Sequence, residues 1–115
     1  MNIKRNLKFF LESRKKNGKT IVENVPIRIR VNYAGYKVDF STGYRIDVEK
    51  WSETEKRVKK NCTNKLQQSA SDINGDLDRF STIIQTIFKE YEIQELIPTP
   101  KQLKEYLYNT ESQNL

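Results

Sequence analysis

Apolar and polar residues alternate along three stretches of the N-terminal half, at about residues 3–13, 25–32 and 36–41. Strict alternation is typical of β-strands with one buried and one solvated face, because successive side chains point to opposite sides of a strand. Turn signals separate the stretches, with Asn17-Gly18 between the first two and Tyr33-Ala34-Gly35 between the last two. The pattern therefore predicts a three-stranded antiparallel sheet with an apolar face and a polar face.

A helical periodicity follows. Apolar residues recur at alternating spacings of four and three, at Leu66, Ala70, Ile73, Leu77, Phe80, Ile84, Ile87 and Tyr91. Such residues share one stripe of an α-helix, and the apolar face of the sheet needs a cover. Thr99, Pro100 and Gln102 have the spacing of an N-cap, a first helical residue and a capping box, which predicts a second, short helix. The expected fold class is α+β, a three-stranded antiparallel β-sheet packed against a long α-helix, with a short C-terminal helix.

Positive charge is concentrated in one half of the chain. The 115 residues, enough for one compact domain, carry a net charge of +6. Residues 1–60 hold 16 Lys and Arg against 7 Asp and Glu, whereas residues 61–115 hold 5 against 8. A one-sided distribution of this kind steers a polyanion to the positive half. The charge pattern therefore favours an anionic partner.

Candidate chemistry is sparse. The sequence has no histidine, the commonest general base and metal ligand, and one cysteine, Cys62, which cannot form a zinc site or an internal disulfide alone. It also lacks paired catalytic carboxylates and a glycine-rich phosphate loop. We expect no enzymatic activity in this chain, no catalytic or metal-binding residue, no cofactor and no small-molecule substrate. No signal peptide or apolar run of about 20 residues is present, so we expect a cytoplasmic chain without membrane partners.

The polar face of the predicted sheet is basic. Arg28 and Arg30 project from the same side of one strand, and Lys37 lies across the hairpin. Arginine matches guanine edges and phosphate oxygens, and a flat basic ribbon fits the major groove of DNA. An ordinary solvated face, with Asp39 paired to Arg28 or Arg30, explains the same pattern equally well. The candidate DNA-binding residues are Lys8, Arg14, Lys15, Lys16, Lys19, Arg28, Arg30, Asn32, Lys37, Ser41 and Arg45.

Several short elements recur in a characteristic order. Pro26-Ile27 opens the second strand, Phe40-Ser41-Thr42-Gly43 ends the third, Trp51 follows about eight residues later, and Arg57-Val58 precedes the helix. In this order they resemble the N-terminal arm-type DNA-binding domain of tyrosine recombinases, the site-specific integrases of conjugative transposons and prophages. The later Thr-Pro-Lys-Gln-Leu-Lys sequence, at 99–104, is similar to that family's entry into its next, helical region.

The resemblance covers nearly the whole chain and implies its role. The polar sheet face would lie in the major groove of arm-type sites in double-stranded DNA, in a bacterial cell. Residues 1–96 would form the arm-type domain, and residues 97–115 would be the linker and truncated start of a core-binding region. A catalytic domain would follow in the full-length recombinase, so no tyrosine of this chain is assigned as its nucleophile. Other integrase protomers or accessory factors would be further partners.

Two alternatives stay open. The helix stripe or an edge strand could contact a partner subunit or an excision factor, which would make the chain a protein-interaction module. In the other alternative, Phe10, Tyr33 and Tyr36 stack on the bases of single-stranded nucleic acid. The first alternative predicts oligomerisation without DNA, and the second predicts a preference for unpaired strands.

Overall fold

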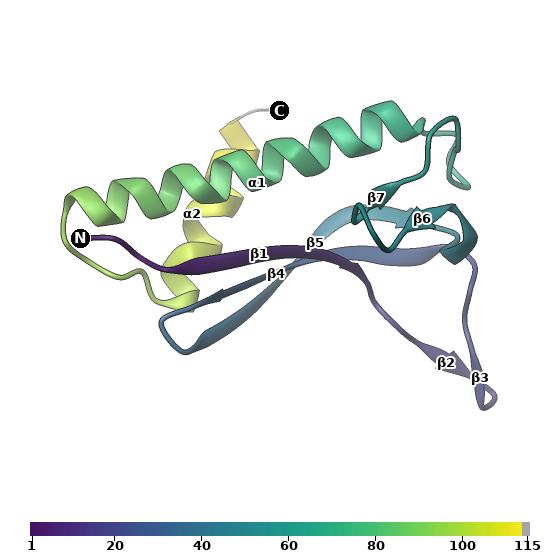
Figure 1. Ribbon diagram of the computed structural model, residues 1–115, viewed down its shortest axis with the longest axis horizontal. Coiled ribbons are helices and arrows are strands. Elements are labelled where there is room, and N and C mark those ends of the chain that lie inside the picture. Colours follow the sequence, from purple (N-terminus) through teal and green to yellow (C-terminus); the bar gives the residue numbers. More distant parts are fainter. Residues whose placement is uncertain (114–115) are drawn as a thin grey trace.

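A sheet covered by one long helix forms the centre of the molecule (Figure 1). The computed structural model describes the backbone of residues 1–113 and the side-chain surroundings of residues 1–109. The sheet has the antiparallel order β1-β4-β5, from β1 (Arg5–Leu11), β4 (Val25–Tyr33) and β5 (Tyr36–Ile46). The other elements are β2 (Lys15–Lys16), β3 (Lys19–Thr20), η1 (Val48–Lys50), β6 (Trp51–Ser52), β7 (Arg57–Val58), α1 (Ala70–Ile93) and α2 (Pro100–Gln113). The predicted α+β fold is confirmed.

The core lies between the apolar face of the sheet and α1. Alternate residues of β4 and β5 are buried there against α1 residues, among them Ile27, Ile29, Val31, Val38, Phe40, Ile73, Leu77, Ile84 and Phe88. The ring of Tyr33 meets the ring of Phe88 edge to face, with centroids 4.9 Å apart. The side chain of Trp51, 4% exposed, joins this core from the β6–β7 hairpin. The predicted amphipathic stripe is therefore the cover of the sheet.

The third strand runs further than predicted because a bulge lets it continue. Arg28 lies opposite Ser41 and Pro26 lies opposite Arg45, so β5 has two more residues than β4 over this stretch. The buried Thr42 hydroxyl donates a hydrogen bond to the Ile27 carbonyl at 2.6 Å. Gly43 has a φ of +82°, which residues with a Cβ adopt only under strain. The Phe40-Ser41-Thr42-Gly43 sequence thus builds the bulge rather than the end of the strand.

The long helix begins later than its apolar stripe suggested. Leu66 is 78% exposed and lies outside α1, so its predicted place on the stripe is wrong. The chain is turned by Gln67, at a φ of +62°, and the Asn64 side-chain oxygen accepts from the backbone N–H of Gln68 at 2.9 Å. The Ser69 hydroxyl then caps α1 by accepting from the Asp72 N–H at 3.1 Å. Local side-chain hydrogen bonds outweigh apolar periodicity here.

The predicted start of the second helix is confirmed. The Thr99 hydroxyl accepts from the Gln102 N–H at 3.1 Å, and the Gln102 side chain accepts from the Thr99 N–H at 2.9 Å. The helix packs Leu103 and Leu107 into the same core as α1. The boundary after residue 96 stays a prediction, and residues 114–115 of the predicted segment 97–115 lie outside the described residues.

Candidate nucleic-acid interface

The side of the sheet that faces away from α1 carries a regular array of side chains. Each of its three rows takes one residue from β1, β4 and β5. The rows are Asn6, Asn32 and Lys37; Lys8, Arg30 and Asp39; and Phe10, Arg28 and Ser41. We call these nine residues the polar sheet face. Five of them are exposed and four are half-buried, so the face is open to a partner.

Arg30 lies at the centre of the polar sheet face and is held on two sides. Asp39 accepts from the Arg30 Nε at 2.8 Å and from its Nη2 at 3.0 Å. The ring centroid of Phe10 lies 4.6 Å from the guanidinium carbon. The ion pair expected of a solvated face therefore exists for Arg30, in a geometry that fixes the guanidinium group.

The paired arginine also changes the acidity of its partner. The hydrogen bond from Arg30 lowers the pKa of Asp39 below its ordinary value. This effect outweighs the opposite effect of burial, which by itself would raise that pKa. A depressed carboxyl pKa contributes stability that is present above the unfolded-state pKa and is lost as the pH falls through the folded-state pKa. The Arg30–Asp39 pair therefore weakens only in acid.

A titration checks this link. In an Arg30→Gln variant the pKa of Asp39 is expected to rise toward its ordinary value, because the charged hydrogen-bond donor is gone. An NMR pH titration of the Asp39 carboxyl carbon measures the change. Lys37→Gln is the control with a smaller expected shift, since Lys37 acts on Asp39 only through its charge. Equal Asp39 pKa values in the wild type and Arg30→Gln would contradict the account.

The other arginine of β4 is held less firmly. The Arg28 Nη1 lies 3.8 Å from the nearest Glu12 carboxylate oxygen, too far for a hydrogen bond. The same carboxylate is engaged by Arg14 through its Nε and Nη2. Within residues 1–109, no carboxylate oxygen lies within 4.0 Å of Lys8 or Lys37. The polar sheet face thus keeps positive charge that no described carboxylate neutralises.

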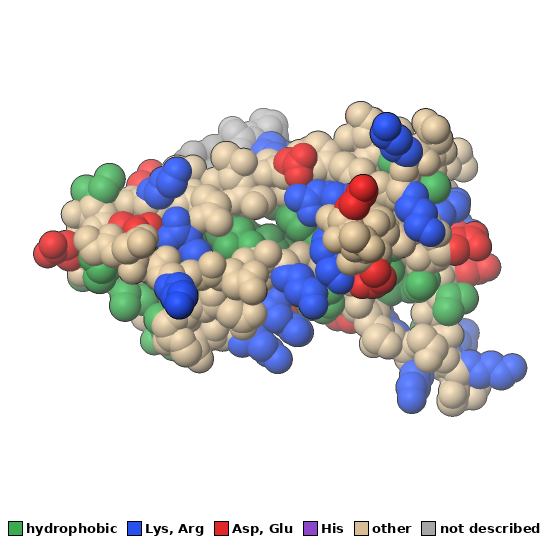
Figure 2. All heavy atoms as spheres, viewed as in Figure 1, with side chains coloured by type: hydrophobic (Ala, Val, Ile, Leu, Met, Phe, Trp, Pro, Cys, Tyr) green, Lys and Arg blue, Asp and Glu red, His purple; other side chains and the backbone are tan. Residues whose placement is uncertain are grey.

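The basic segment between β1 and β4 is an ordered hairpin, β2–β3. Asn17 and Gly18 occupy its turn with φ values of 54° and 78°, and the Ile21 N–H donates to the Arg14 carbonyl at 2.8 Å. Lys16 and Lys19 lie directly opposite each other, and like charges in this arrangement destabilise a hairpin. In Figure 1 the hairpin projects from the sheet on the side away from α1, and Figure 2 shows its basic side chains.

Two predicted residues lie at the bulge. The Ser41 hydroxyl accepts from the Gly43 N–H at 3.2 Å, and the Arg45 Nη1 donates to the Asn24 carbonyl at 3.2 Å.

The predicted site residues fall into two groups in the structure. It brings together on the polar sheet face Lys8, Arg28, Arg30, Asn32, Lys37 and Ser41. It places Arg14, Lys15, Lys16 and Lys19 on or beside the hairpin and Arg45 beyond the bulge. The predicted site residues left out Asn6, although alternation already put it on the same side of its strand as Lys8; the structure places it opposite Asn32.

Basic residues on the other side of the sheet are neutralised by α1. Arg5 forms an ion pair with Glu92 at 2.8 Å and lies over the Phe88 ring. Arg57 pairs with Asp78 at 2.7 Å. The carboxylates of α1 offset these two cations. The polar sheet face and the hairpin carry Lys8, Lys37, Lys15, Lys16 and Lys19, which form no ion pair among the described residues, and Figure 2 shows basic side chains on the hairpin.

One of the three aromatic residues considered for base stacking is not accessible. Tyr33 is 3% exposed, packs on Phe88, and donates its hydroxyl hydrogen to the Pro98 carbonyl at 2.7 Å. Burial raises its pKa to about 12. Tyr33 is therefore a core residue, and Phe10 has one face occupied by Arg30.

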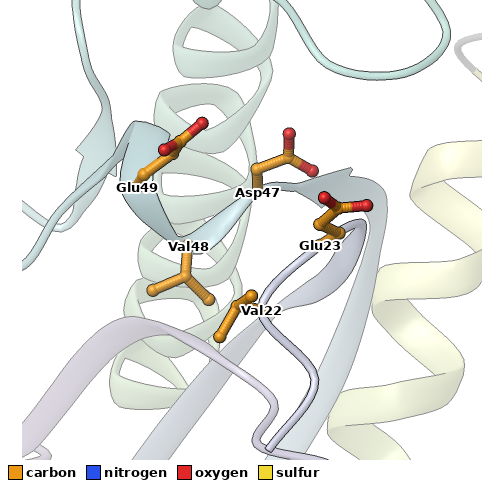
Figure 3. Close-up of a pocket in the computed structure, with 5 residues that line it drawn as sticks. All are labelled: Val22, Glu23, Asp47, Val48 and Glu49. Atoms are coloured by element: carbon orange, nitrogen blue, oxygen red, sulfur yellow. The ribbon is translucent and has the colours of Figure 1, made fainter.

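A hollow of about 290 Å³ lies near the base of the hairpin (Figure 3). Val22, Glu23, Asp47, Val48 and Glu49 line it. Asp47 accepts from the Asn24 N–H at 2.9 Å, which lowers the Asp47 pKa, and it also neighbours Lys65 and Lys50. This carboxylate holds the chain where it enters β4, so its contacts are accounted for within the protein.

The described residues contain no group of three or more His, Cys, Asp or Glu side chains that could hold a metal ion. Neither α1 nor the described part of α2 has the length and apolar character of a membrane-spanning helix.

Comparison with known proteins gives the family. The family model described as Arm DNA-binding domain matches residues 9–113, from β1 through α2. No curated protein and no solved structure matches the chain. The family match identifies a non-catalytic domain whose partner is double-stranded DNA. The chain belongs to the arm DNA-binding domain family, the N-terminal DNA-binding domains of tyrosine recombinases.

Proposed function

We propose that the chain binds arm-type DNA sites sequence-specifically as the N-terminal domain of a site-specific tyrosine recombinase, with the polar sheet face in the major groove. The observation that carries this proposal is the uncompensated positive charge of the polar sheet face and the β2–β3 hairpin. Recombination itself would require a catalytic domain outside this chain. Other protomers of the recombinase or accessory factors are the further partners in this proposal.

The size of the sheet supports the docking mode. Neighbouring strands lie about 4.8 Å apart, so the backbones of β1 and β5 are separated by about 10 Å. The major groove of B-form DNA is about 12 Å wide. Side chains of β4 would then face the base edges, and the edge strands and hairpin would lie closer to the phosphates. Phosphate contacts would supply affinity that falls with salt, and base contacts would supply specificity.

The two alternatives find less support. Tyr33 cannot stack on the bases of single-stranded nucleic acid, because it is buried in the core. The helix stripe that could have contacted a partner protein is the cover of the sheet, since Ile73, Leu77 and Ile84 are fully buried. The edge of β1 stays available for protein contacts, but nothing in the charge pattern requires such a partner.

A competition experiment tests the proposed function. The 115-residue chain is titrated with a labelled pool of duplex DNA, and unlabelled duplexes or single strands of the same composition compete. We expect duplex to compete better and affinity to fall steeply with salt. Preference for single strands, or oligomerisation with no DNA affinity, would contradict the proposal.

A pair of double variants locates the binding face. Arg28→Ala/Arg30→Ala removes two charges from the polar sheet face and is expected to weaken duplex binding about 30-fold near physiological salt. Lys101→Ala/Lys104→Ala removes the same charge from exposed positions of α2 and serves as the matched control. Equal losses in the two variants would place the interface elsewhere.

A further inference from the structure

The Arg30 guanidinium has a defined set of free donors. A guanidinium group has five N–H bonds in one plane. Asp39 takes the Nε–H and one N–H of Nη2, through hydrogen bonds of 2.8 and 3.0 Å. This side-on pairing leaves both N–H bonds of Nη1 and the second N–H of Nη2. Among the described residues, the end of the guanidinium therefore presents a two-donor fork without a partner.

The direction of this fork is fixed by its surroundings. Phe10 lies on β1 and Asp39 on β5, so Arg30 on the central strand is held from both neighbouring strands. The guanidinium carbon lies 4.6 Å from the centroid of the Phe10 ring, and the Asp39 carboxylate engages one edge of the guanidinium through two hydrogen bonds. A donor pair held in this way loses little freedom when it binds an acceptor pair.

Charge decides which acceptor suits the fork. Asp39 already places a negative charge beside Arg30, so a second full anion such as a phosphate group would be repelled by that carboxylate. A neutral pair of acceptors carries no such penalty. In the major groove, guanine presents two acceptors side by side, N7 and O6, which match an arginine fork. The central strand is also the one furthest from the phosphate walls in the proposed docking mode.

Arg28 differs from Arg30 in each of these respects. Its nearest carboxylate oxygen, on Glu12, is 3.8 Å away, and its guanidinium lies over no aromatic ring among the described residues. The direction of the Arg28 guanidinium is therefore not fixed by its neighbours, unlike that of Arg30. The comparison singles out Arg30 from the two arginines of β4.

We propose that Arg30, held by Asp39 and Phe10, forms a guanine-binding site that determines one base of the DNA sequence this chain recognises. The inference rests on the proposed function, because it requires the polar sheet face to lie in the major groove. Asp39 and Phe10 act as positioning residues in it, and Arg30 makes the contact through Nη1 and Nη2.

Selection from randomised duplex DNA tests the site. The wild-type chain is expected to select guanine at one position that Arg30→Ala no longer prefers, with a loss of discrimination of about 5- to 150-fold at that position alone. Arg28→Ala is the matched control and should retain the guanine. Thermal unfolding of both variants confirms that they fold.

A modified base gives a second test that leaves the protein intact. Replacing the selected guanine by 7-deazaguanine removes the N7 acceptor, and it should weaken binding of the wild type but not of Arg30→Ala. An even loss of affinity over all sequences in Arg30→Ala, or no effect of the modified base on the wild type, would overturn the guanine site while the proposed function stands. Absence of duplex binding by the wild type would overturn both.

Discussion

Replacing Phe88 with alanine is expected to destabilise the chain by about 3–5 kcal/mol, the largest effect that we predict for a single substitution. Phe88 is fully buried, its ring meets Tyr33 edge to face, and the Arg5 guanidinium lies 4.9 Å from its centroid. The substitution would leave a cavity where α1 meets the sheet. Since single domains are stable by only about 5–15 kcal/mol, a large fraction of the folding free energy would be lost.

Chemical denaturation of the wild type and the variant measures this loss. Ile93→Ala is the matched control, because Ile93 lies on the same helix but is 83% exposed. We expect that control to change the free energy of unfolding by less than about 0.5 kcal/mol. A Phe88→Ala variant as stable as the control would mean that the sheet and α1 do not pack as described.

The second large effect concerns the β2–β3 hairpin. A Lys15→Gln/Lys16→Gln/Lys19→Gln variant is expected to bind duplex DNA about 100-fold more weakly near physiological salt. If each lysine neutralises one phosphate, the slope of log affinity against log salt also becomes shallower by about 3. The fold should not suffer, because all three side chains are exposed and the removal of Lys16 and Lys19 relieves a cross-strand repulsion.

Fluorescence anisotropy at several salt concentrations measures the hairpin's contribution. A variant with the same total charge, Lys89→Gln/Lys101→Gln/Lys104→Gln, changes exposed lysines of α1 and α2 instead. If both triple variants show the same slope, the hairpin does not contact the phosphates and only net charge matters.

Much of the fold follows from local patterns in the chain. Alternation along β1, β4 and β5 gave the sheet and its two faces, because a period of two fixes the side to which each residue points. The Thr99–Gln102 spacing gave the start of α2, because a capping box is made within one turn. These features depend on neighbours in sequence.

Other features depend on contacts between distant residues, and the sequence did not settle them. The length of β5 depends on a hydrogen bond from Thr42 to Ile27 across the sheet, and on Gly43 at positive φ. Leu66 matched the helical spacing but lies in a turn that Asn64 organises. Periodicity cannot reveal such competing hydrogen bonds.

In the candidate site, too, some features follow from local sequence patterns and others depend on contacts between distant residues. Alternation placed Lys8, Arg28, Arg30 and Lys37 on one face, where the structure has them. The pairing of Asp39 with Arg30 rather than Arg28 depended on strand register, which the sequence left open. Strand register also places Phe10 beside Arg30. The Arg30 guanidinium is therefore held in place, whereas that of Arg28 is not.

We expect the polar sheet face and the β2–β3 hairpin to contact duplex DNA. Chemical-shift mapping can locate the interface, by titrating the ¹⁵N-labelled chain with a duplex selected from the randomised pool. Shift changes should be concentrated in β1, β4, β5 and the hairpin, with the exposed side of α1 unaffected. Changes concentrated on α1 or α2, with the amides around Arg30 and Lys16 unmoved, would contradict that expectation.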